Sequence, residues 1–396
     1  MPFAGRHVVL GVSGGIASYK SCILARRLTE AGALVDVVLT ASATEFVGPS
    51  TFEALTGRPV LTSLWERDRA LAHIALAHQP ELVILAPATA NLLARAAAGA
   101  ADDLLTSILL ARTGPVLCAP AMNDAMFAHP ATTANVKTLA TRGWEFVGPD
   151  VGPLAEGPSS RPGRMSEPEH IFAAAARVLG TRAPWAGKRV VVTAGPTREH
   201  LDPVRVITNP SSGRMGYALA EAAAERGADV TLISGPVDLA APYGVVVHRV
   251  ETTEELQRAL QVVIKKADAL FMAAAPADYK PKDQAKTKRP RGRDALTLTL
   301  EGTPDILASL TRPERLLAVG FALETGGGLE RAKAKLRDKN LDYIVLNDAL
   351  EPGAGFEVST NRVTIIADQG EPLVLPLLSK REVADRILDA VERALT

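Results

Sequence analysis

Residues 7–20 of the 396-residue chain read HVVLGVSGGIASYK and decide the fold of its first half. The apolar run HVVLGV predicts a buried strand, and the residues after the two glycines have the spacing of a helix. Glycines at such a turn let the backbone approach a phosphate, and the N–H groups at the start of the helix attract an anion. The turn therefore predicts a ligand-binding loop. The alternative is that the glycines only allow the strand and the helix to pack closely.

The ligand expected at this turn is a phosphate or a flavin rather than NAD. The loop lacks the GxGxxG spacing of dinucleotide-binding proteins. The next expected strand, LVDVVLT at residues 34–40, ends in Thr40, and Ser42 comes two residues later. A Rossmann domain needs an acidic side chain at this place to bind the ribose. Hydroxyl groups here favour a pocket for a phosphate or a flavin.

The rest of the chain alternates short apolar runs with segments of helical period, which is typical of parallel sheets covered by helices. Helices are expected over residues 16–32, closed by Gly32, and over 167–180 and 379–395. The expected strands are HVVLGV, LVDVVLT, LVILAP, PVLCAP and WEFVGP in the first half and RVVVTAG, ADVTLIS, YGVVVHRV, ALFMAAA, RLLAVGFA, DYIVLND and RVTIIAD in the second.

The two halves are separated by a short stretch of different composition. Residues 181–187 contain Pro and Gly without periodicity and predict a linker, after which RVVVTAGPT repeats the strand-and-glycine opening of the chain. Residues 278–295 are basic and irregular, and we expect a mobile loop there. The prediction is an α/β protein with two doubly wound, Rossmann-like domains in series, residues 1–180 and 188–396.

Composition limits the classes of partner. Lys plus Arg and Asp plus Glu both number 44, so no overall field favours nucleic acid or an anionic membrane. The apolar runs are too short to span a membrane, and the N-terminal residues lack the pattern of a signal peptide. Cys22 and Cys118 lie in apolar surroundings without CxxC spacing, which indicates a reducing compartment. We expect a cytoplasmic protein that binds small molecules.

Three further segments of the first half carry residues suited to a binding site. His73 lies among apolar residues, where a histidine is either a base or a buried packing residue. PATAN, residues 87–91, ends an expected strand at the edge where α/β sheets hold ligands, or else caps the next helix. Asn123 could bind a carboxylate through its amide, or simply form a turn.

His73, PATAN and PAMNDAMF at 120–127 follow one another in the same order as similar motifs of the homo-oligomeric flavin-containing cysteine decarboxylases. The resemblance to that family covers about the first 180 residues. Phe127 stands where that family usually has Trp. The resemblance implies a flavodoxin-like domain in which FMN oxidises a cysteinyl thiol, CO₂ leaves and the electrons return. It implies His73 as the base, Asn123 at the substrate carboxylate, and Met122 as a further substrate-binding residue. It implies an FMN site formed by Ser13, Gly14, Gly15, Ile16, Thr40, Ser42, Pro87, Ala88, Thr89 and Ser107.

One departure from that family concerns the proton donor. Many members carry a cysteine on a mobile flap, in a stretch resembling LACG…GRM, and this cysteine donates a proton. Here residues 153–165 read PLAEGPSSRPGRM, and Glu156 stands in its place. A glutamic acid could donate if flap closure raised its pKa. The alternative is that Glu156 is a solvated loop residue and that water or another group donates.

The most informative stretch of the second half is AGPTREHLDPVRVITNPSSGRMG, residues 194–216. Two serines and a glycine precede an expected helix, which predicts an anion site, with helix capping as the alternative. Arg205 and Asn209 are four residues apart and could bind one phosphate or carboxylate. No GxxxxGK[ST] motif is present, so the second half is not a P-loop enzyme.

Cations further along suit a nucleoside triphosphate. Lys286, Lys335 and Lys339 could neutralise its charge, normally together with Mg²⁺, although a solvated helix face also explains the last two. The second half resembles the phosphopantothenate–cysteine ligases, and the whole chain resembles the bacterial fusions of decarboxylase and ligase. The resemblance implies that CTP activates 4′-phosphopantothenate as an acyl cytidylate, which the amine of cysteine then attacks. It implies decarboxylase trimers and ligase dimers.

The resemblance also assigns residues of the ligase site. Asn209 and Arg205 would contact the phosphopantothenate, and Lys286 the triphosphate. Thr303 stands where the family has Asn, whose place the loop backbone could take. The remaining residues of the implied CTP pocket are Ala273, Ala274, Asp278, Thr303, Pro304, Asp305, Ile306, Phe321, Lys335 and Lys339.

Two other classes of protein are possible. A dinucleotide-dependent oxidoreductase would also have two Rossmann-like domains, but it would carry GxGxxG. A non-catalytic flavoprotein regulator would not need His73, Asn123 or a ligase-like second half.

Overall fold

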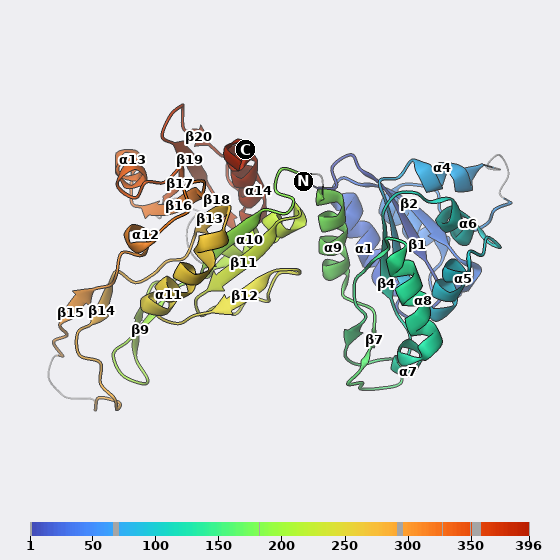
Figure 1. Ribbon diagram of the computed structural model, residues 1–396, viewed down its shortest axis with the longest axis horizontal. Coiled ribbons are helices and arrows are strands. Elements are labelled where there is room, and N and C mark those ends of the chain that lie inside the picture. Colours follow the sequence, from blue (N-terminus) through green and yellow to red (C-terminus); the bar gives the residue numbers. More distant parts are fainter. Residues whose placement is uncertain are drawn as a thin grey trace. The chain divides into compact units, whose positions relative to one another are not determined.

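The computed structural model divides the chain into two compact units, Met1–Thr181 and Arg182–Thr396 (Figure 1). The structure describes residues 2–65, 71–181, 183–290, 296–326, 328–348, 350 and 358–395. Each unit is built on its own parallel sheet, and each is described by itself below.

Unit 1 contains a five-stranded parallel sheet in the order β2-β1-β3-β4-β5. This is the flavodoxin-like strand order of doubly wound folds. All five strands expected in the first half are confirmed. They are β1 (His7–Val12), β2 (Leu34–Leu39), β3 (Leu82–Ala88), β4 (Val116–Pro120) and β5 (Glu145–Phe146).

Helices cover both faces of this sheet (Figure 1). The helix expected over 16–32 is α1, and Gly32, two residues past its end, has φ +88. Helix α1 packs on α3 and α9, while α4 packs on α6 and α5 on α8. The helices are α1 (Ser18–Glu30), α2 (Ala41–Thr44), α3 (Pro49–Thr56), α4 (Ala72–His78), α5 (Ala90–Ala98), α6 (Leu104–Ala111), α7 (Asp124–Ala128), α8 (Pro130–Thr141) and α9 (Pro168–Gly180).

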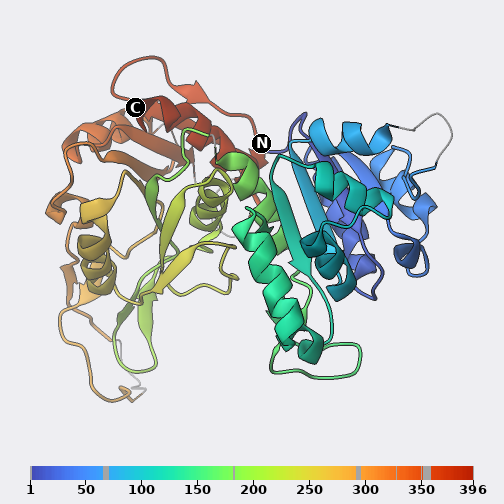
Figure 2. The same ribbon diagram turned by 45° about the vertical axis from the view of Figure 1, so that its right-hand side comes forward.

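A short antiparallel hairpin follows the sheet. It consists of β6 (Asp150–Val151) and β7 (Pro162–Arg164), and the segment between them is the flap expected around Glu156. Strand β7 packs on α7, and the two lie side by side in both views (Figure 1, Figure 2). The flap therefore returns to the start of α7, where Asn123 is located.

Unit 2 contains an eight-stranded sheet in the order β12-β11-β8-β13-β16-β17-β19-β20. Its first six strands are parallel and follow the Rossmann order, whereas β19 and β20 are antiparallel additions. The strands expected in the second half are confirmed. The bounds are β8 (Arg189–Ala194), β11 (Asp229–Ser234), β12 (Val246–Arg249), β13 (Ala269–Met272), β16 (Leu317–Glu324), β17 (Tyr343–Asp348), β19 (Val363–Ala367) and β20 (Leu373–Val374).

The helices of unit 2 follow the same alternation. The expected C-terminal helix is α14, which continues as a 3-10 turn over Glu392–Leu395. The helices are α10 (Arg214–Glu225), α11 (Thr253–Val263), α12 (Ile306–Ser309), α13 (Leu329–Asp338) and α14 (Lys380–Val391), with a second 3-10 turn over Ile264–Lys266.

Unit 2 also has two short antiparallel ribbons that sequence patterns did not predict. Strands β9 (Arg198–His200) and β10 (Val206–Thr208) form one, and β14 (Tyr279–Pro281) and β15 (Leu300–Gly302) form the other. They pack on each other (Figure 1).

The prediction of an irregular loop over residues 278–295 is wrong at its start, because β14 pairs there with β15. Strands of three residues are too short to show a period of two. Residues 291–295 lie outside the described residues. The remaining short pair is β18 (Thr360–Asn361) with β21 (Leu378–Ser379).

The stretch expected to be a linker contributes to the core of unit 2. Trp185 is fully buried, and its ring centroid lies 6.0 Å from that of Phe271 on β13. A single aromatic residue in a stretch rich in Pro and Gly has no periodicity, so its burial was not predictable. The contact boundary between the units falls between residues 181 and 182.

Candidate active sites

A cavity of about 590 Å³ lies at the carboxyl ends of β1, β3 and β4 in unit 1. This is the edge at which doubly wound sheets bind ligands. Both the loop after β1 and the flap contribute to its walls. The predicted site residues around it are Ser13, Gly14, Gly15, Ile16, Thr40, Ser42, Thr89, Met122, Asn123 and Glu156.

Several helices begin at this cavity. Thr40 accepts a hydrogen bond from Ala43 N and caps α2, and Thr89 accepts one from Leu92 N and caps α5. Helix α1 starts after Ala17 without a side-chain cap. The helix starts and the hydroxyl groups beside them make the cavity favourable for an anion.

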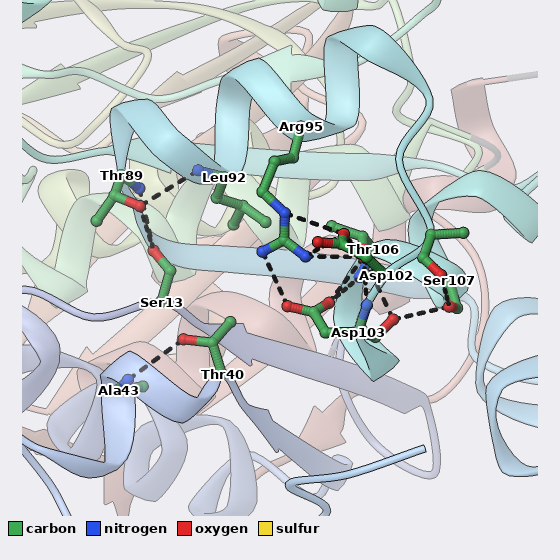
Figure 3. Close-up of polar contacts among 11 residues, drawn as sticks. Ser13, Thr40, Ala43, Thr89, Leu92, Arg95, Asp102, Asp103, Thr106 and Ser107 are labelled. Carbon is green, nitrogen blue, oxygen red and sulfur yellow. Dashed lines mark hydrogen bonds and ion pairs between the residues drawn. The ribbon is translucent and has the colours of Figure 1, made fainter. Parts of the chain in front are cut away.

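Ser13 joins the ends of two strands. Its Oγ donates to Pro87 O (2.8 Å) and accepts from Thr89 N (3.0 Å), as Figure 3 shows for Ser13 and Thr89. Pro87 and Ala88 were predicted to bind the cofactor. Neither is among the cavity residues; Pro87 instead holds Ser13 in place through its carbonyl.

Gly14 is needed because of a close approach between two loops. A Cβ at this position would lie 2.4 Å from Ser42 Cβ and 2.6 Å from Ser42 O. The loop after β1 and the start of α2 therefore touch at Gly14. Any larger residue would push them apart and reshape the cavity, so close packing alone accounts for a glycine at this position.

The cavity brings Asn123 and Glu156 together. The Asn123 Nδ2 donates a hydrogen bond to Glu156 Oε1, while its Oδ1 accepts from Ala125 N (2.8 Å) and caps α7. The cap fixes the orientation of the amide, so that its N–H groups point to the flap. Glu156 is exposed at the flap tip.

The flap is fastened to α7 by an ion pair. Asp124, the first residue of α7, accepts hydrogen bonds from Ser159 Oγ (2.5 Å) and from Arg161 Nη2 (3.1 Å). The hydrogen bond from Ser159, and after it that from Arg161, lower the pKa of the Asp124 carboxyl against the opposing effect of burial. The flap is therefore held over the cavity by a carboxylate that stays ionised.

Besides Pro87 and Ala88, two further predicted residues are not among those that line the cavity. His73 is half-buried on α4 and is not among the cavity residues. Ser107 on α6 donates to Asp103 O (2.7 Å) and lies with the Asp102 and Asp103 carboxylates, away from Ser13 and Thr40 (Figure 3).

Three cations that line the cavity were missed from the sequence, namely Lys20, Arg95 and Arg164. Lys20 is only 6% exposed, and its Nζ donates to Met165 O (3.2 Å) and Glu167 Oε1 (3.1 Å) just beyond β7. Arg95 on α5 pairs with Asp102 and Asp103 (Figure 3). Lys20 lies seven residues after Ser13 on the helix that follows the glycine loop, and this spacing was the available signal.

Both cysteines are free, and neither is among the cavity residues. Burial raises the pKa of the Cys22 and Cys118 thiols. Neither thiol has the environment of a reactive group.

In unit 2, most of the predicted ligase residues lie near the carboxyl ends of β8, β13 and β16. Gly195 and Gly213 both have positive φ and lie against each other, since a Cβ on Gly213 would be 3.3 Å from Gly195 N. Gly213 directly precedes α10. The first turn of α10 therefore sits at the carboxyl end of β8, as expected for an anion site.

Asn209 connects this region to the end of β13. Its Nδ2 donates to Ala275 O (3.3 Å) and Pro276 O (3.0 Å). The adjoining residues Ala273 and Ala274 are half-buried, and Ala274 N donates to Thr193 Oγ1 (3.0 Å) on β8. Asn209 thus lies beside the residues predicted to line the cytidine site.

The other predicted nucleotide residues continue the same edge. Thr303 N donates to Asp278 O (2.9 Å), and Pro304 and Asp305 lead into α12, whose first residue, Ile306, is buried.

The cations on α13 are held close to this edge. Lys339 pairs with Asp305, and Lys335 Nζ donates to Phe321 O (3.2 Å) on β16. Lys335 and Lys339 therefore contact two other predicted residues, Phe321 and Asp305, and do not form a plain solvated helix face.

Arg205 and Lys286 lie outside this cluster of contacts. Arg205 forms an ion pair with Asp202, a fully buried carboxylate that sequence analysis missed. The hydrogen bonds from Arg205, and after them those from the backbone, hold the pKa of Asp202 well below its usual range despite its burial. Lys286 is exposed on the loop after β14.

Within the described part of the chain, no helix is long and apolar enough to cross a membrane.

Comparison with known proteins places both units. A model of the Flavoprotein family matches residues 3–180, and a model of the DNA/pantothenate metabolism flavoprotein C-terminal domain matches residues 185–395. The chain is similar to the coenzyme A biosynthesis bifunctional protein CoaBC of Vibrio cholerae, with 45% identity over 99% of both chains. It is 45% identical to the CoaBC protein of Bacillus subtilis, over 98% of this chain and 96% of that one. A crystal structure of the C-terminal domain of a CoaBC protein covers 54% of this chain and 97% of its own, at 41% identity and a TM-score of 0.46.

The CoaBC proteins of Vibrio cholerae and Bacillus subtilis match both units in one order over nearly the whole chain. The chain belongs to the family of coenzyme A biosynthesis bifunctional proteins.

Proposed function

We propose that unit 2 condenses 4′-phosphopantothenate with cysteine at the expense of CTP, and that unit 1 decarboxylates the product to 4′-phosphopantetheine with bound FMN. Family membership supports two successive steps of coenzyme A biosynthesis. The assignment of unit 1 rests on one observation, namely that the loop of Ser13 and Gly14, Asn123 and Glu156 all line the same cavity.

The cavity residues fit FMN. The loop of Ser13 and Gly14 lines the cavity just before the N-terminus of α1, and the Thr40 and Thr89 hydroxyls line it too, so these groups would bind the phosphate of FMN. The volume of about 590 Å³ is in the range of ligand pockets. When bound, FMN would accept electrons from the cysteinyl thiol and return them after CO₂ has left.

The chain itself would orient the substrate and supply protons. The side-chain amide of Asn123, oriented by its cap of α7, is proposed to bind the substrate carboxylate. It would do so with the N–H groups that donate to Glu156 in this structure. Once the substrate takes that place, Glu156 is free to face the decarboxylated carbon, and the closed flap excludes water from it. His73 is proposed as the base.

A second copy of the chain would have to bring His73 to the cavity, because His73 is not on the cavity of its own unit. We therefore propose a homo-oligomer, with decarboxylase trimers and ligase dimers. Ile16, Tyr19 and Met126 support it, since they line the cavity and are 64%, 55% and 51% exposed. Apolar side chains gathered at a cavity mouth are typical of an interface.

In unit 2, the start of α10 and Asn209 are proposed to hold phosphopantothenate, and the end of β13 and the turn before α12 to hold cytidine. Lys335, Lys339 and the loop residue Lys286 would neutralise the triphosphate, which carries Mg²⁺ with it. Attack by the amine of cysteine on the acyl cytidylate would then form the amide. We place both steps in the cytoplasm, where thiols such as Cys22 stay reduced.

The test is incubation of the full chain with 4′-phosphopantothenate, cysteine, CTP and Mg²⁺, followed by mass spectrometry. We expect 4′-phosphopantetheine and a yellow protein. Omission of CTP should stop the sequence before the amide. A colourless protein that forms only phosphopantothenoylcysteine would support the ligase activity proposed for unit 2 and refute the decarboxylase activity proposed for unit 1.

A further inference from the structure

Residues 285–289 form a loop segment, called the arc below, on which Lys286 and Lys288 are exposed. Both ends of the arc are held by hydrogen bonds. Ala285 N donates to Leu201 O (3.0 Å), and Arg289 N donates to Asp202 Oδ2 (3.1 Å). Leu201 and Asp202 belong to the turn between β9 and β10, about 85 residues earlier in the chain. The turn and the arc are therefore one structural element.

Asp202 is the centre of this element. Its Oδ1 accepts from Val204 N and Arg205 N, both at 2.9 Å. Its Oδ2 accepts from Arg205 Nε (2.9 Å) and Nη2 (2.6 Å) as well as from Arg289 N. A fully buried carboxylate is tolerated only when donors compensate it in this way, so its partners are held firmly.

Arg205 completes the attachment. Its Nη2 also donates to Arg289 O (2.7 Å), so both backbone groups of Arg289 are bonded to the Asp202–Arg205 pair. The side chain of Arg289 turns back along its own segment, where Nη2 donates to Asp283 O (3.0 Å). The backbone of Arg289, rather than its charge, is what the pair holds.

We propose that Asp202 is a positioning residue of the ligase, which fixes the arc so that Lys286 is presented to the triphosphate before the nucleotide binds. This inference rests on the proposed function of unit 2. A loop lysine that is not held must be ordered on binding, and that loss of entropy weakens affinity. Asp202 itself does not touch the nucleotide.

The test is a double-mutant cycle between Asp202→Asn and Lys286→Ala, with pyrophosphate release measured against CTP concentration. Asp202→Asn should raise KM for CTP about tenfold, as expected for loss of a hydrogen bond to a charged group. In the Lys286→Ala background the same change should add almost nothing, because there is no lysine left to position. KM for cysteine should not move.

Asp385→Asn is the matched control. Asp385 is another nearly buried carboxylate of unit 2, paired with Arg226 and Arg381, and it lies on α14 away from the arc. It should lower Tm without changing KM for CTP. If Asp202→Asn behaves like this control, or if its effect multiplies with that of Lys286→Ala, the positioning role is refuted. Wild-type protein that releases no pyrophosphate from CTP would instead refute the proposed function.

Should Asp202→Asn not fold, a pair at Arg289 gives the same answer. Arg289→Pro removes the backbone N–H that donates a hydrogen bond to Asp202, whereas Arg289→Ala removes only the side chain. We expect the raised KM for CTP in the proline variant alone. Equal values in the two variants would overturn the proposal.

Discussion

The side-chain amide of Asn123 donates a hydrogen bond to the Glu156 carboxylate, 33 residues further along the chain. Asn123 caps α7 just after β4, and Glu156 lies at the tip of the flap. A substrate carboxylate that displaces Glu156 from Asn123 would therefore free the flap carboxylate at the moment the substrate binds.

Glu156→Gln should release CO₂ but fail to complete the reaction, because an amide cannot donate the proton that the product carbon needs. Stopped-flow absorbance should show the flavin remaining reduced while CO₂ is formed. Glu145→Gln, an exposed carboxylate on β5, is the control and should turn over normally. Full yield of 4′-phosphopantetheine from Glu156→Gln would mean that the proton comes from elsewhere.

His73→Asn should keep its flavin and lose decarboxylation by about two to four orders of magnitude, the range of a positioned base. Asn123→Ala should lose it through weaker substrate binding. If His73 acts on the cavity of a second copy, co-expression of the two variants should restore part of the activity in mixed oligomers. His129→Asn is the control, since Asn is a good substitute for the helix cap that His129 forms. Absence of recovery in verified mixed oligomers would contradict an intersubunit base.

Lys286→Ala and Asn209→Asp should separate the two halves of the ligase reaction. The lysine variant should slow pyrophosphate release, because it lacks charge at the triphosphate. The aspartate variant should still accumulate acyl cytidylate but transfer it slowly to cysteine. Quench-flow with mass spectrometry distinguishes them, and an equal loss of pyrophosphate release in both would be the contrary result.

Lys20→Met should loosen the flap, since Lys20 joins α1 to Met165 and Glu167 at the flap root. Hydrogen exchange should rise over residues 152–161, and KM for phosphopantothenoylcysteine should rise more than kcat falls. Lys20→Arg should restore part of the protection, and Lys137→Met, an exposed lysine of α8, should have no effect. Unchanged exchange in the Met variant would remove this role.

Alkylation of the folded protein should not abolish decarboxylation. Burial raises the pKa of both thiols, so Cys22 and Cys118 stay protonated and slow to react at neutral pH. After iodoacetamide treatment and desalting, turnover should remain near that of untreated enzyme. Rapid inactivation with a single alkylated site would show that a thiol takes part after all.

Several features were predictable from the sequence because they depend on local patterns. Strand β1 and the start of α1 follow from apolar periodicity and two glycines within residues 7–20. Both sheets follow from the repetition of that pattern, and the places of Asn123 and Thr89 follow from their position just after a strand.

Features made by distant segments were not predictable in this way. Trp185 was expected in a linker, yet it is buried in the core of unit 2. The ribbons β9–β10 and β14–β15 have strands of three residues, whose pattern is too short to recognise. Asp202 occurs in a polar stretch, where nothing local distinguishes a buried carboxylate from an exposed one.

By itself, the sequence determined two doubly wound domains, the ligand edge of each sheet and the residue types available there. Only the tertiary structure decided that Glu156 meets Asn123, that Lys20 holds the flap root, that His73 is absent from its own cavity, and that Asp202 fixes the loop of Lys286. The physical reason is that secondary structure follows from interactions within a few residues. Burial of a charge or pairing of two loops depends instead on which distant donors the completed fold brings within hydrogen-bond distance.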